Sequence, residues 1–470
     1  MLKSFMFRML VLICVFNLPL IISCNRTPET SLNLLQLSKK PVVEQIKQRG
    51  KLIAVTQFNS VDYFLYHGEP AGYQFDLLKL FAKHLGVELE IIVRNDLDEA
   101  IHLLNRGQAD LIAEDLFAGR VDTSRIDFTL PVGKSRLLIV QPSGNKCPGQ
   151  LCINSAIDLS GKTIPVASET TEYKRLEGTL ITLHLESKIL ELENTQQGEV
   201  IKLVAEKTIP FTVADEKTAI IYASRYPNLD ISVPLSRFQT THWGIRKGAD
   251  AWGMLIDDWL GGFLNTNAAT LIYKKYFGPT KWRKAAAGSL VQNARLSDYD
   301  LLLKKATHKL GWDWRLLAAL IFQESKFSHE AVSRKGAAGI MQLMPATAIE
   351  YGIDSTSTTP QHIAAGIGLL YNIDRQLKHF VADSTERMKF VLASYNVGIG
   401  HVFDARRLAM KHGRNPDKWA EVEIYMLKKS EPAYYTDNVV YYGYCHGEEP
   451  TNFVKNILKR YKHYQNLIGE

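Results

Sequence analysis

Apolar and polar positions alternate in two different ways in the first half of the chain. Lys51–Thr56 is a short apolar run, and Val87–Val93 alternates between apolar and polar residues, as β-strands do. Tyr73–Leu85 and Asp96–Leu104 instead repeat their apolar residues at the spacing of an amphipathic helix. Strands and helices in this order are typical of an α/β domain with a parallel sheet, which we predict for residues 46–277.

The pattern changes in the C-terminal part of the chain, where residues 298–470 are dominated by helical periodicity. The strongest predicted helix is Trp314–Phe327, whose apolar positions recur from Leu317 at intervals of three and four residues. The next position in this series is Glu324, so the spacing places a carboxyl group on the apolar face. A Gly-Pro break opens residues 278–297, which we predict to be a linker.

The N-terminus has two basic residues followed by an apolar run that ends at Cys24. The run is shorter than the ~20 residues that a membrane-spanning helix needs, so residues 1–23 are predicted to be a cleaved export signal. An uncleaved membrane anchor with an incidental Cys24 is the alternative. Residues 24–45 are polar with scattered prolines, and we predict that they form a tether.

The end of this apolar run resembles the lipobox of bacterial lipoproteins, with the small Ser23 directly before Cys24. The resemblance implies cleavage before Cys24, diacylation of its thiol and acylation of its amino group. Acyl chains contribute about 0.8 kcal/mol per buried CH₂, so several chains hold a protein at a membrane surface. Asn25 follows the cysteine, which in such lipoproteins suggests the outer membrane of a diderm bacterium. We therefore expect the chain at the periplasmic face of that membrane.

Composition and charge restrict the class of partner. The 470 residues are 46% hydrophobic and 22% charged, as in soluble globular proteins. The net charge of +7 comes from residues 278–470, which hold 26 Lys and Arg against 19 Asp and Glu, whereas residues 1–277 hold 30 of each. This bias suits an anionic polymer, although a solvated basic face is the simpler interpretation. No basic run with interleaved aromatic residues indicates nucleic acid.

Cysteine and histidine spacings give no support to a metal site. The chain has neither a CxxC pair nor an HExxH helix, so we expect no metal and no other cofactor. Cys147 and Cys152 are close enough in sequence to close a small disulfide loop in an oxidising periplasm, which leaves Cys445 unpaired.

Several stretches of the α/β region resemble the family-3 bacterial solute-binding proteins, among them GKLIAVT, EPAGYQFDLLKLFAKHLGVELEII and FTVADEKTAIIYASRYPNL. The resemblance implies two lobes joined by crossing strands, with a ligand in the cleft between them. We expect the crossing strands at Arg136–Pro142 and His242–Arg246, which gives a second lobe at about 145–240. The ligand would resemble an amino acid or a muropeptide.

Two residues are candidates for contacts with that ligand. In amino-acid-binding relatives an Arg holds the α-carboxylate in bidentate geometry, and an Asp of the second lobe holds the α-amino group. Asp215, in TVADEKTA, matches that Asp by context. Arg120 is the candidate for the Arg, although its spacing departs from the family pattern. A surface Arg in a turn is the alternative for Arg120.

Three motifs follow one another in the helical region: ES at Glu324-Ser325, G-x-x-G-I-M-Q at 336–342 and A-S-Y-N-V-G at Ala393–Gly398. Together they resemble the lysozyme-like domain of lytic transglycosylases, enzymes that cut peptidoglycan. The resemblance implies that Glu324 is the catalytic acid and base. It also implies substrate contacts by Ser325, Met341, Gln342, Tyr395 and Asn396. Phe453 stands where the family often has Tyr, and some tyrosines of Tyr434–Tyr444 are expected to stack on sugars.

A desolvated carboxyl group has a raised pKa and stays protonated near neutral pH, as a general acid requires. From spacing alone, a Glu that points to solvent is the alternative. Hydrolysis of a glycosidic bond normally needs two carboxylates. The resemblance implies a different reaction, in which the substrate's own C6 hydroxyl attacks and 1,6-anhydro ends form.

Two other functions remain open from the sequence. In a hydrolytic muramidase, Glu330, Asp354 or Asp374 would supply the second carboxylate. In a non-enzymatic receptor, a lipid-anchored chain would only grip glycan. The presence of both the ES and the YNVG motif favours an enzyme.

Overall fold

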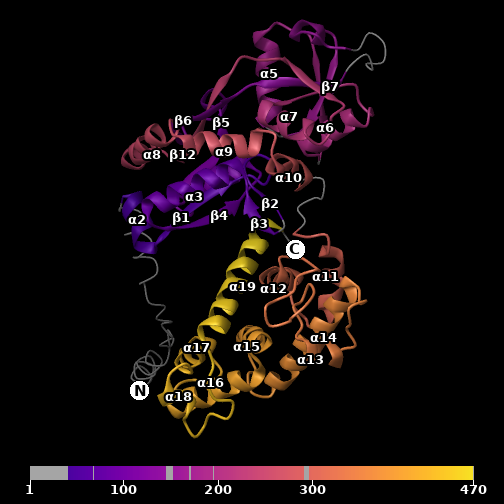
Figure 1. Ribbon diagram of the computed structural model, residues 1–470. Helices are drawn as coiled ribbons and strands as arrows, with labels where there is room; N and C mark the ends of the chain where they lie inside the picture. The colour runs from indigo at the N-terminus through magenta and orange to yellow at the C-terminus, as the bar shows by residue number, and fades with distance from the viewer. Residues whose placement is uncertain are drawn as a thin grey trace, which may run out of the picture.

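A computed structural model gives the arrangement of the chain. It describes residues 41–66, 68–143, 152–168, 171–193, 195–289 and 296–468. Figure 1 shows a two-lobed N-terminal domain and, next to its first lobe, a helical C-terminal domain. In these six ranges no helix is both long and apolar enough to cross a bilayer. The predicted signal peptide and Cys24 lie outside the described residues.

The first lobe is built on a five-stranded sheet in the order β4-β1-β5-β12-β6. Its strands are β1 (Lys51–Thr56), β4 (Glu88–Val93), β5 (Leu111–Leu116), β6 (Ile126–Ser135) and β12 (Gln239–Arg246). β1 is parallel to β4 and β5, and β12 is antiparallel to β5 and β6. The lobe also contains α2 (Val42–Arg49), α3 (Tyr73–Leu85), α4 (Leu97–Asn105), α8 (Asp250–Phe263), α9 (Asn267–Phe277), α10 (Lys281–Ser289) and the hairpin β2 (Phe64–Tyr66) and β3 (Glu69–Ala71).

The second lobe has its own hydrophobic core. Strand β7 (Leu137–Pro142) lies between β10 (Thr212–Asp215) and β11 (Leu229–Pro234), and β8 (Thr163–Ala167) pairs with β9 (Lys188–Leu192). The 3-10 helix Ala156–Leu159 and helices α5 (Thr171–Thr182), α6 (Gln197–Ala205) and α7 (Glu216–Ala223) complete the lobe. Cys152, at its start, is disulfide-bonded, and Cys147 lies outside the described residues.

The chain crosses between the lobes at Arg136 and again between Pro234 and Gln239. β6 pairs with β12 in the first lobe, whereas β7 begins two residues later as the central strand of the second-lobe sheet. The second lobe therefore starts before the predicted boundary of 145 and ends before 240. Of the predicted crossing strand Arg136–Pro142, all but Arg136 forms β7 and belongs to the second lobe itself. An apolar run cannot distinguish a connecting strand from a central one, because both are buried on two faces.

The C-terminal domain is made of helices. They are α11 (Asp300–Ala306), the 3-10 helix Thr307–Lys309, α12 (Trp314–Ser325), α13 (Pro345–Glu350), α14 (Thr359–Lys378), α15 (Ser384–Val397), α16 (Ile399–Lys411), α17 (Trp419–Lys428), α18 (Pro432–Tyr435) and α19 (Glu448–Leu467). α12 packs against α11 and α19, and α15 packs against α14, α16 and α19. Two helices that carry sequence motifs, α12 and α15, therefore share α19 as a neighbour.

Helix α19 also joins the two domains, because its C-terminal half reaches the first lobe (Figure 1). Lys459 Nζ lies 2.8 Å from a carboxylate oxygen of Glu88, and Arg460 Nη1 donates to the carbonyl of Gly68 at 3.1 Å. Gly68 has a φ of 72° and lies against α12, where a Cβ atom would come within 2.4 Å of the ring of Phe322. Only glycine fits this close contact without rearrangement.

Candidate active site

Glu324 lies in the last turn of α12, an almost completely buried helix. The carboxylate of Asp313 caps the N-terminus by accepting from the backbone N–H of Arg315, and Lys326 ends the helix with a φ of 51°. The eight residues from Arg315 to Phe322 are all buried. Glu324 is half-buried at the end of this helix, so its carboxyl group meets the domain surface from an apolar setting.

The setting of Glu324 suits a general acid. Burial, and secondarily the negative charge of Glu449, raises the pKa of Glu324 to about 8. Desolvation disfavours the ionised carboxylate, and a neighbouring carboxylate adds to that cost. The carboxyl group is therefore mostly protonated at neutral pH and can protonate a leaving oxygen. The prediction that Glu324 lies on the apolar face agrees with this position.

The loop after α12 turns on residues with positive φ. Gly336 has a φ of 85°, Gly339 of 77° and Gln342 of 50°. A Cβ atom on Gly339 would lie 2.4 Å from Nδ1 of His362, so glycine is needed there for space as well as for backbone conformation. The hydroxyl of Ser325 donates to the carbonyl of Ile340 at 2.8 Å, which joins this loop to α12.

Two residues predicted to line the cleft have other roles in the loop. Met341 is fully buried, and its side chain packs where a Cβ atom of Gly366 would lie. The prediction that Met341 lines the cleft is therefore wrong, because its thioether fills the core of the domain. Gln342 is half-buried, and its Nε2 donates to the carbonyls of Ala331 and Gly339 at 2.8 and 2.9 Å. These bonds hold the loop in place. They use the amide nitrogen of Gln342, so its amide oxygen is the group that can accept a hydrogen bond from a ligand.

The third motif lies on α15. Tyr395 donates its hydroxyl to the carbonyl of Met341 at 2.7 Å, and burial, followed by the charge of Glu324, raises the pKa of Tyr395 well above its usual value. Glu324 and Tyr395 are therefore electrostatic neighbours. Asn396 follows on the same helix and is half-buried. Gly398 ends α15 with a φ of 89° and begins α16, so the two helices meet without a longer loop.

A hydrolytic muramidase would need Glu330, Asp354 or Asp374 as its second carboxylate, and none of the three shifts the pKa of Glu324. Glu330 is exposed, Asp354 accepts from Thr356 and Ser357 in its own turn, and Asp374 pairs with Arg387 at 2.8 Å. The carboxylate that influences Glu324 is Glu449, at the start of α19. It lies four residues before Phe453, the position where the family often has Tyr.

The tyrosines of the segment Tyr434–Tyr444 differ in their exposure to solvent. Tyr434 packs on Tyr425 and accepts from Lys428, whereas Tyr441, Tyr442 and Tyr444 are exposed. Phe453 is buried in the core of the domain, and as a phenylalanine it has no hydroxyl to offer a substrate.

A buried ion pair holds the loop that carries the exposed tyrosines. Asp404 and Lys429 are both fully buried and lie 2.7 Å apart. The Asp404 carboxylate also accepts from the backbone N–H groups of Tyr441 and Tyr442 at 2.8 and 2.9 Å. Side chains separated by many residues along the chain thus fix this surface.

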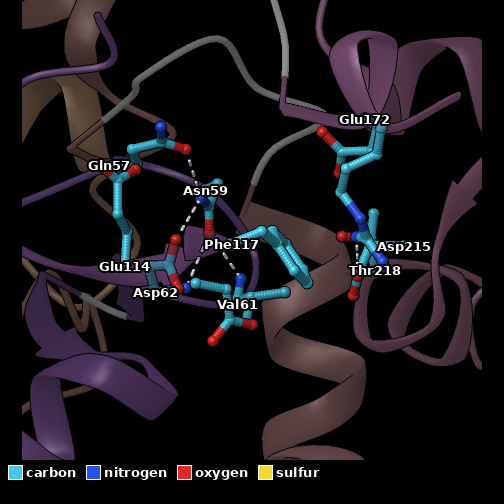
Figure 2. A pocket seen from close by; sticks show the side chains of 11 residues that line it. Gln57, Asn59, Val61, Asp62, Glu114, Phe117, Glu172, Asp215 and Thr218 are labelled. Carbon is cyan, nitrogen blue, oxygen red and sulfur yellow. Dashed lines mark hydrogen bonds and ion pairs between the residues drawn. The ribbon is translucent and has the colours of Figure 1, made fainter. Parts of the chain in front are cut away.

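The first domain has a second candidate site, a cleft between its lobes. It is lined by Asp62, Glu114 and Phe117 from the first lobe and by Glu172, Arg175 and Asp215 from the second. Figure 2 shows the labelled residues of the two lobes facing each other across this cleft.

Asp215 lines the cleft as predicted, where it accepts from Arg175 Nη1 at 2.6 Å and caps α7. Arg120 lies at the end of the 3-10 helix Ala118–Arg120, and its side chain is outside the described residues. No sequence motif singles out Arg175, which lies on α5.

Metal binding has no structural candidate in the described ranges, since they contain no group of three or more His, Cys, Asp or Glu side chains able to hold an ion. Cys445 is a buried free thiol, as the cysteine spacing predicts.

Two domain families match the chain. Residues 53–279 match the family "Bacterial extracellular solute-binding proteins, family 3", and residues 302–420 match the "Transglycosylase SLT domain". Among solved structures, the first half is similar to a crystal structure of an ancestral amino acid-binding protein, a precursor of cyclohexadienyl dehydratase. That similarity has 22% identity and a TM-score of 0.42, over 51% of this chain and 100% of the other.

Two relatives match the chain over most of its length. The chain is 32% identical over 421 residues to the membrane-bound lytic murein transglycosylase F of Desulfosudis oleivorans, covering 89% of this chain and 90% of the relative. It is 29% identical to the protein of the same name from Ectopseudomonas mendocina, covering 96% and 89%. With Glu324, the glycine loop and Tyr395 placed together, the chain belongs to the family of membrane-bound lytic murein transglycosylase F and is a peptidoglycan lytic transglycosylase.

Proposed function

We propose that the chain cleaves the β-1,4 bond between N-acetylmuramic acid and N-acetylglucosamine without water and leaves 1,6-anhydro-N-acetylmuramic acid ends. The observation that carries this proposal is the protonated carboxyl group of Glu324, whose pKa burial raises to about 8. Among Glu330, Asp354 and Asp374, each is exposed or engaged elsewhere, so none is placed to activate water beside Glu324.

The reaction proceeds in two proton transfers. Glu324 gives its proton to the glycosidic oxygen as the bond to C1 of N-acetylmuramic acid breaks, and N-acetylglucosamine leaves with that proton. The substrate's acetamido group stabilises the electron-poor C1. The carboxylate of Glu324 then takes the proton from the C6 hydroxyl of the same sugar, whose oxygen attacks C1 and closes the anhydro ring. Because this nucleophile is part of the substrate, a high effective molarity replaces a positioned water molecule.

Four residues of the site are proposed to hold the glycan. Asn396 and the amide oxygen of Gln342 can bond the N-acetyl groups, because each presents a polar group from the elements that frame Glu324. Ser325 and Tyr395 hold backbone carbonyls of the loop through their hydroxyl protons, and their oxygens can still accept a bond from a sugar hydroxyl.

Digestion of purified peptidoglycan by the full chain tests the reaction. Mass spectrometry of the released fragments is expected to find anhydro ends, each one water lighter than the hydrolytic product. Reducing ends in their place would identify a hydrolytic muramidase. Glu324→Gln is expected to lower turnover by about 10²–10⁴-fold, the usual contribution of general acid–base catalysis, while glycan binding remains. Glu330→Gln, at an exposed position six residues away, is the matched control and is expected to keep full activity.

We propose further that Cys24 is the lipid attachment site and holds the enzyme at the periplasmic face of the outer membrane. The relatives named above are described as membrane-bound, which supports an envelope location. Labelling of growing cells with a radioactive fatty acid is expected to mark the protein, and Cys24→Ala is expected to abolish both the label and membrane association. A Cys24→Ala protein that stays in the membrane fraction would indicate an uncleaved anchor.

The proposed role of the first domain is to regulate the second through a bound ligand. The cleft residues Asn59, Val61 and Asp62 closely precede the hairpin of β2 and β3. Gly68, directly before β3, contacts Phe322, two residues before Glu324. Arg460 also lies over the ring of Phe322 at 3.4 Å and bonds the carbonyl of Gly68.

If this contact transmits ligand binding, Arg460→Met is expected to reduce any change in digestion rate caused by a ligand. Lys459→Met, which removes a neighbouring exposed ion pair, is the control and is expected to keep that change. Equal responses in both variants would mean that the Gly68 contact does not carry regulation.

A further inference from the structure

The cleft of the first domain has more carboxylates than cations to pair with them. Five carboxylates line it, from Asp62, Glu114, Asp115, Glu172 and Asp215. Two cations pair with two of them at 2.6 Å, Lys217 with Asp115 and Arg175 with Asp215. Asp62, Glu114 and Glu172 therefore remain without a cationic partner at ion-pair distance in the described part of the chain. Buried negative charge in this excess is costly unless a cation joins it.

One cation in the cleft has unused hydrogen-bonding groups. Arg175 is 2% exposed, and its Nε and Nη2 atoms have no hydrogen-bond partner among the described residues. Its Nη1 donates to the carboxylate of Asp215. The guanidinium lies over the ring of Phe117, with 3.8 Å between the guanidinium carbon and the ring centroid, so its plane is fixed. Nε and Nη2 lie on the same side of a guanidinium, which is the pair of donors that a carboxylate accepts in bidentate fashion.

Asp62 offers the complementary unused group from the other lobe. It is 5% exposed, and its Oδ2 accepts from Nδ2 of Asn59 at 2.7 Å, whereas its Oδ1 has no partner. Figure 2 shows Asp62 and Glu114 on the first-lobe side of the cleft, opposite Glu172 and Asp215 of the second lobe. An unpaired buried acceptor and an unpaired buried donor pair thus lie on opposite walls of one cleft.

We propose that this cleft binds a small zwitterion that carries at least one more cationic nitrogen than a neutral amino acid. Its carboxylate binds Arg175, and one of its cationic groups binds Asp62. The inference rests on the proposed role of the first domain as a ligand-binding domain and specifies its ligand class. Side chains of both lobes line the cleft, which suits a small ligand held between them.

This assignment reverses the polarity expected from the sequence. There, an Arg of the first lobe was to hold the carboxylate and Asp215 the amino group. In the structure Asp215 is already engaged, because Oδ2 accepts from Arg175 and Oδ1 accepts from the backbone N–H of Lys217. The second lobe therefore presents donors through Arg175, and the first lobe presents an acceptor through Asp62.

Binding of such a cation is coupled to proton release. Burial, followed by the charge of Asp115, raises the pKa of Asp62 to about 8, with Asn59 and Lys217 acting in the opposite direction and Asp215 adding to the rise. At pH 7 the empty cleft therefore holds a mostly protonated Asp62. A cationic ligand favours the carboxylate, so its binding releases a proton, and its affinity increases as the pH rises toward 8.

Isothermal titration of the full chain with four probes tests the proposal: L-lysine, L-leucine, L-glutamate and cadaverine, which is lysine without its carboxylate. L-Lysine is expected to bind at least about tenfold more tightly than any of the other three, because it combines a carboxylate for Arg175 with a second ammonium group for the excess carboxylates of the cleft. Repeating the lysine titration in buffers of different ionisation enthalpy is expected to reveal proton release at pH 7. Preference for leucine or glutamate, or tighter binding of cadaverine than of lysine, would overturn the proposal. So would the failure of all four probes to bind.

Two variants assign the ends of the ligand. Asp62→Asn keeps the shape of the side chain and is expected to reduce the affinity for lysine by about tenfold or more and to abolish proton release. Arg175→Lys keeps the charge beside Asp215 and is expected to weaken lysine but not cadaverine. Glu44→Gln, at an exposed position on α2, is the control and is expected to change nothing. Unchanged lysine binding in Asp62→Asn would also contradict the assignment.

These outcomes are separate from the test of the enzyme itself. Lysine binding by Glu324→Gln is expected to match that of the unmodified chain, because Glu324 does not line the cleft. Tight binding of leucine or glutamate would leave a ligand-binding first domain in place and overturn only the ligand class. Loss of anhydro products would concern Glu324 and not the cleft.

Discussion

The hydroxyl of Ser325 donates a hydrogen bond of 2.8 Å to the backbone carbonyl of Ile340. The bond joins the last turn of the catalytic helix to the glycine loop fifteen residues later. Tyr395 makes the corresponding bond from α15 to the next carbonyl, that of Met341. Two side chains from different helices thus hold two successive carbonyls of one loop, and this arrangement fixes the loop beside Glu324.

Ser325→Ala removes one of these bonds and leaves a carbonyl unpaired. The chain is expected to lose about 1 kcal/mol of unfolding free energy, as for a typical buried hydrogen bond. Turnover is expected to fall by about tenfold or more, because a small displacement of the loop changes the position of the substrate. Urea unfolding and peptidoglycan digestion measure the two effects. Ser328→Ala, at an exposed position, is the control, and equal behaviour of both variants would refute the role of the Ile340 contact.

Glu449→Gln is expected to change the pH dependence of digestion. Glu324 must be protonated to act as an acid, so activity is lost as the pH rises through its pKa of about 8. Removing the negative charge of Glu449 lowers that pKa, and the alkaline limb of the profile therefore moves to lower pH. The shift is partial because burial, the larger cause, remains. Glu448→Gln, the exposed neighbour, is expected to leave the limb unchanged.

Asp404→Asn leaves the ammonium group of Lys429 buried without its carboxylate. Both side chains are fully buried, so the variant is expected to lose about 3–5 kcal/mol of unfolding free energy, the usual cost of breaking a buried pair. Asp417→Asn also removes one partner of an ion pair, with Arg406, but the Asp417 side chain is 48% exposed. This control is expected to lose about 1 kcal/mol or less. Urea unfolding of the C-terminal domain, followed by tryptophan fluorescence, distinguishes the two.

Cys445 is expected to react slowly with alkylating reagents in the folded protein. The side chain is 4% exposed, and burial raises the pKa of its thiol, so little reactive thiolate is present at pH 8. Peptide mass spectrometry after timed treatment with iodoacetamide measures the rate, with the urea-unfolded chain as reference. Similar rates in both states would show that the thiol is accessible.

Local pattern predicted the main features of the fold. The alternation of strands and helices in the first domain and the amphipathic helix that ends near Glu324 follow from periodicity, because side chains on one face of an element must share one environment. The positive φ angles of Gly336 and Gly339 also follow from residue type, since only glycine adopts them without strain at so crowded a turn. The lobe boundary could not be placed this way, because an apolar strand does not reveal which sheet it joins.

The sequence by itself indicated the residues that we propose to carry the chemistry: a single Glu at the end of an apolar helix, a glycine loop and a Tyr-Asn pair. Only the tertiary structure decided how their polar atoms are used. It buried Met341, engaged Ser325 and Tyr395 with the loop, brought Glu449 to Glu324, and set Arg175 opposite Asp62. The physical reason is that periodicity is a local property, whereas burial, charge and hydrogen bonding depend on groups that meet only when distant segments pack together.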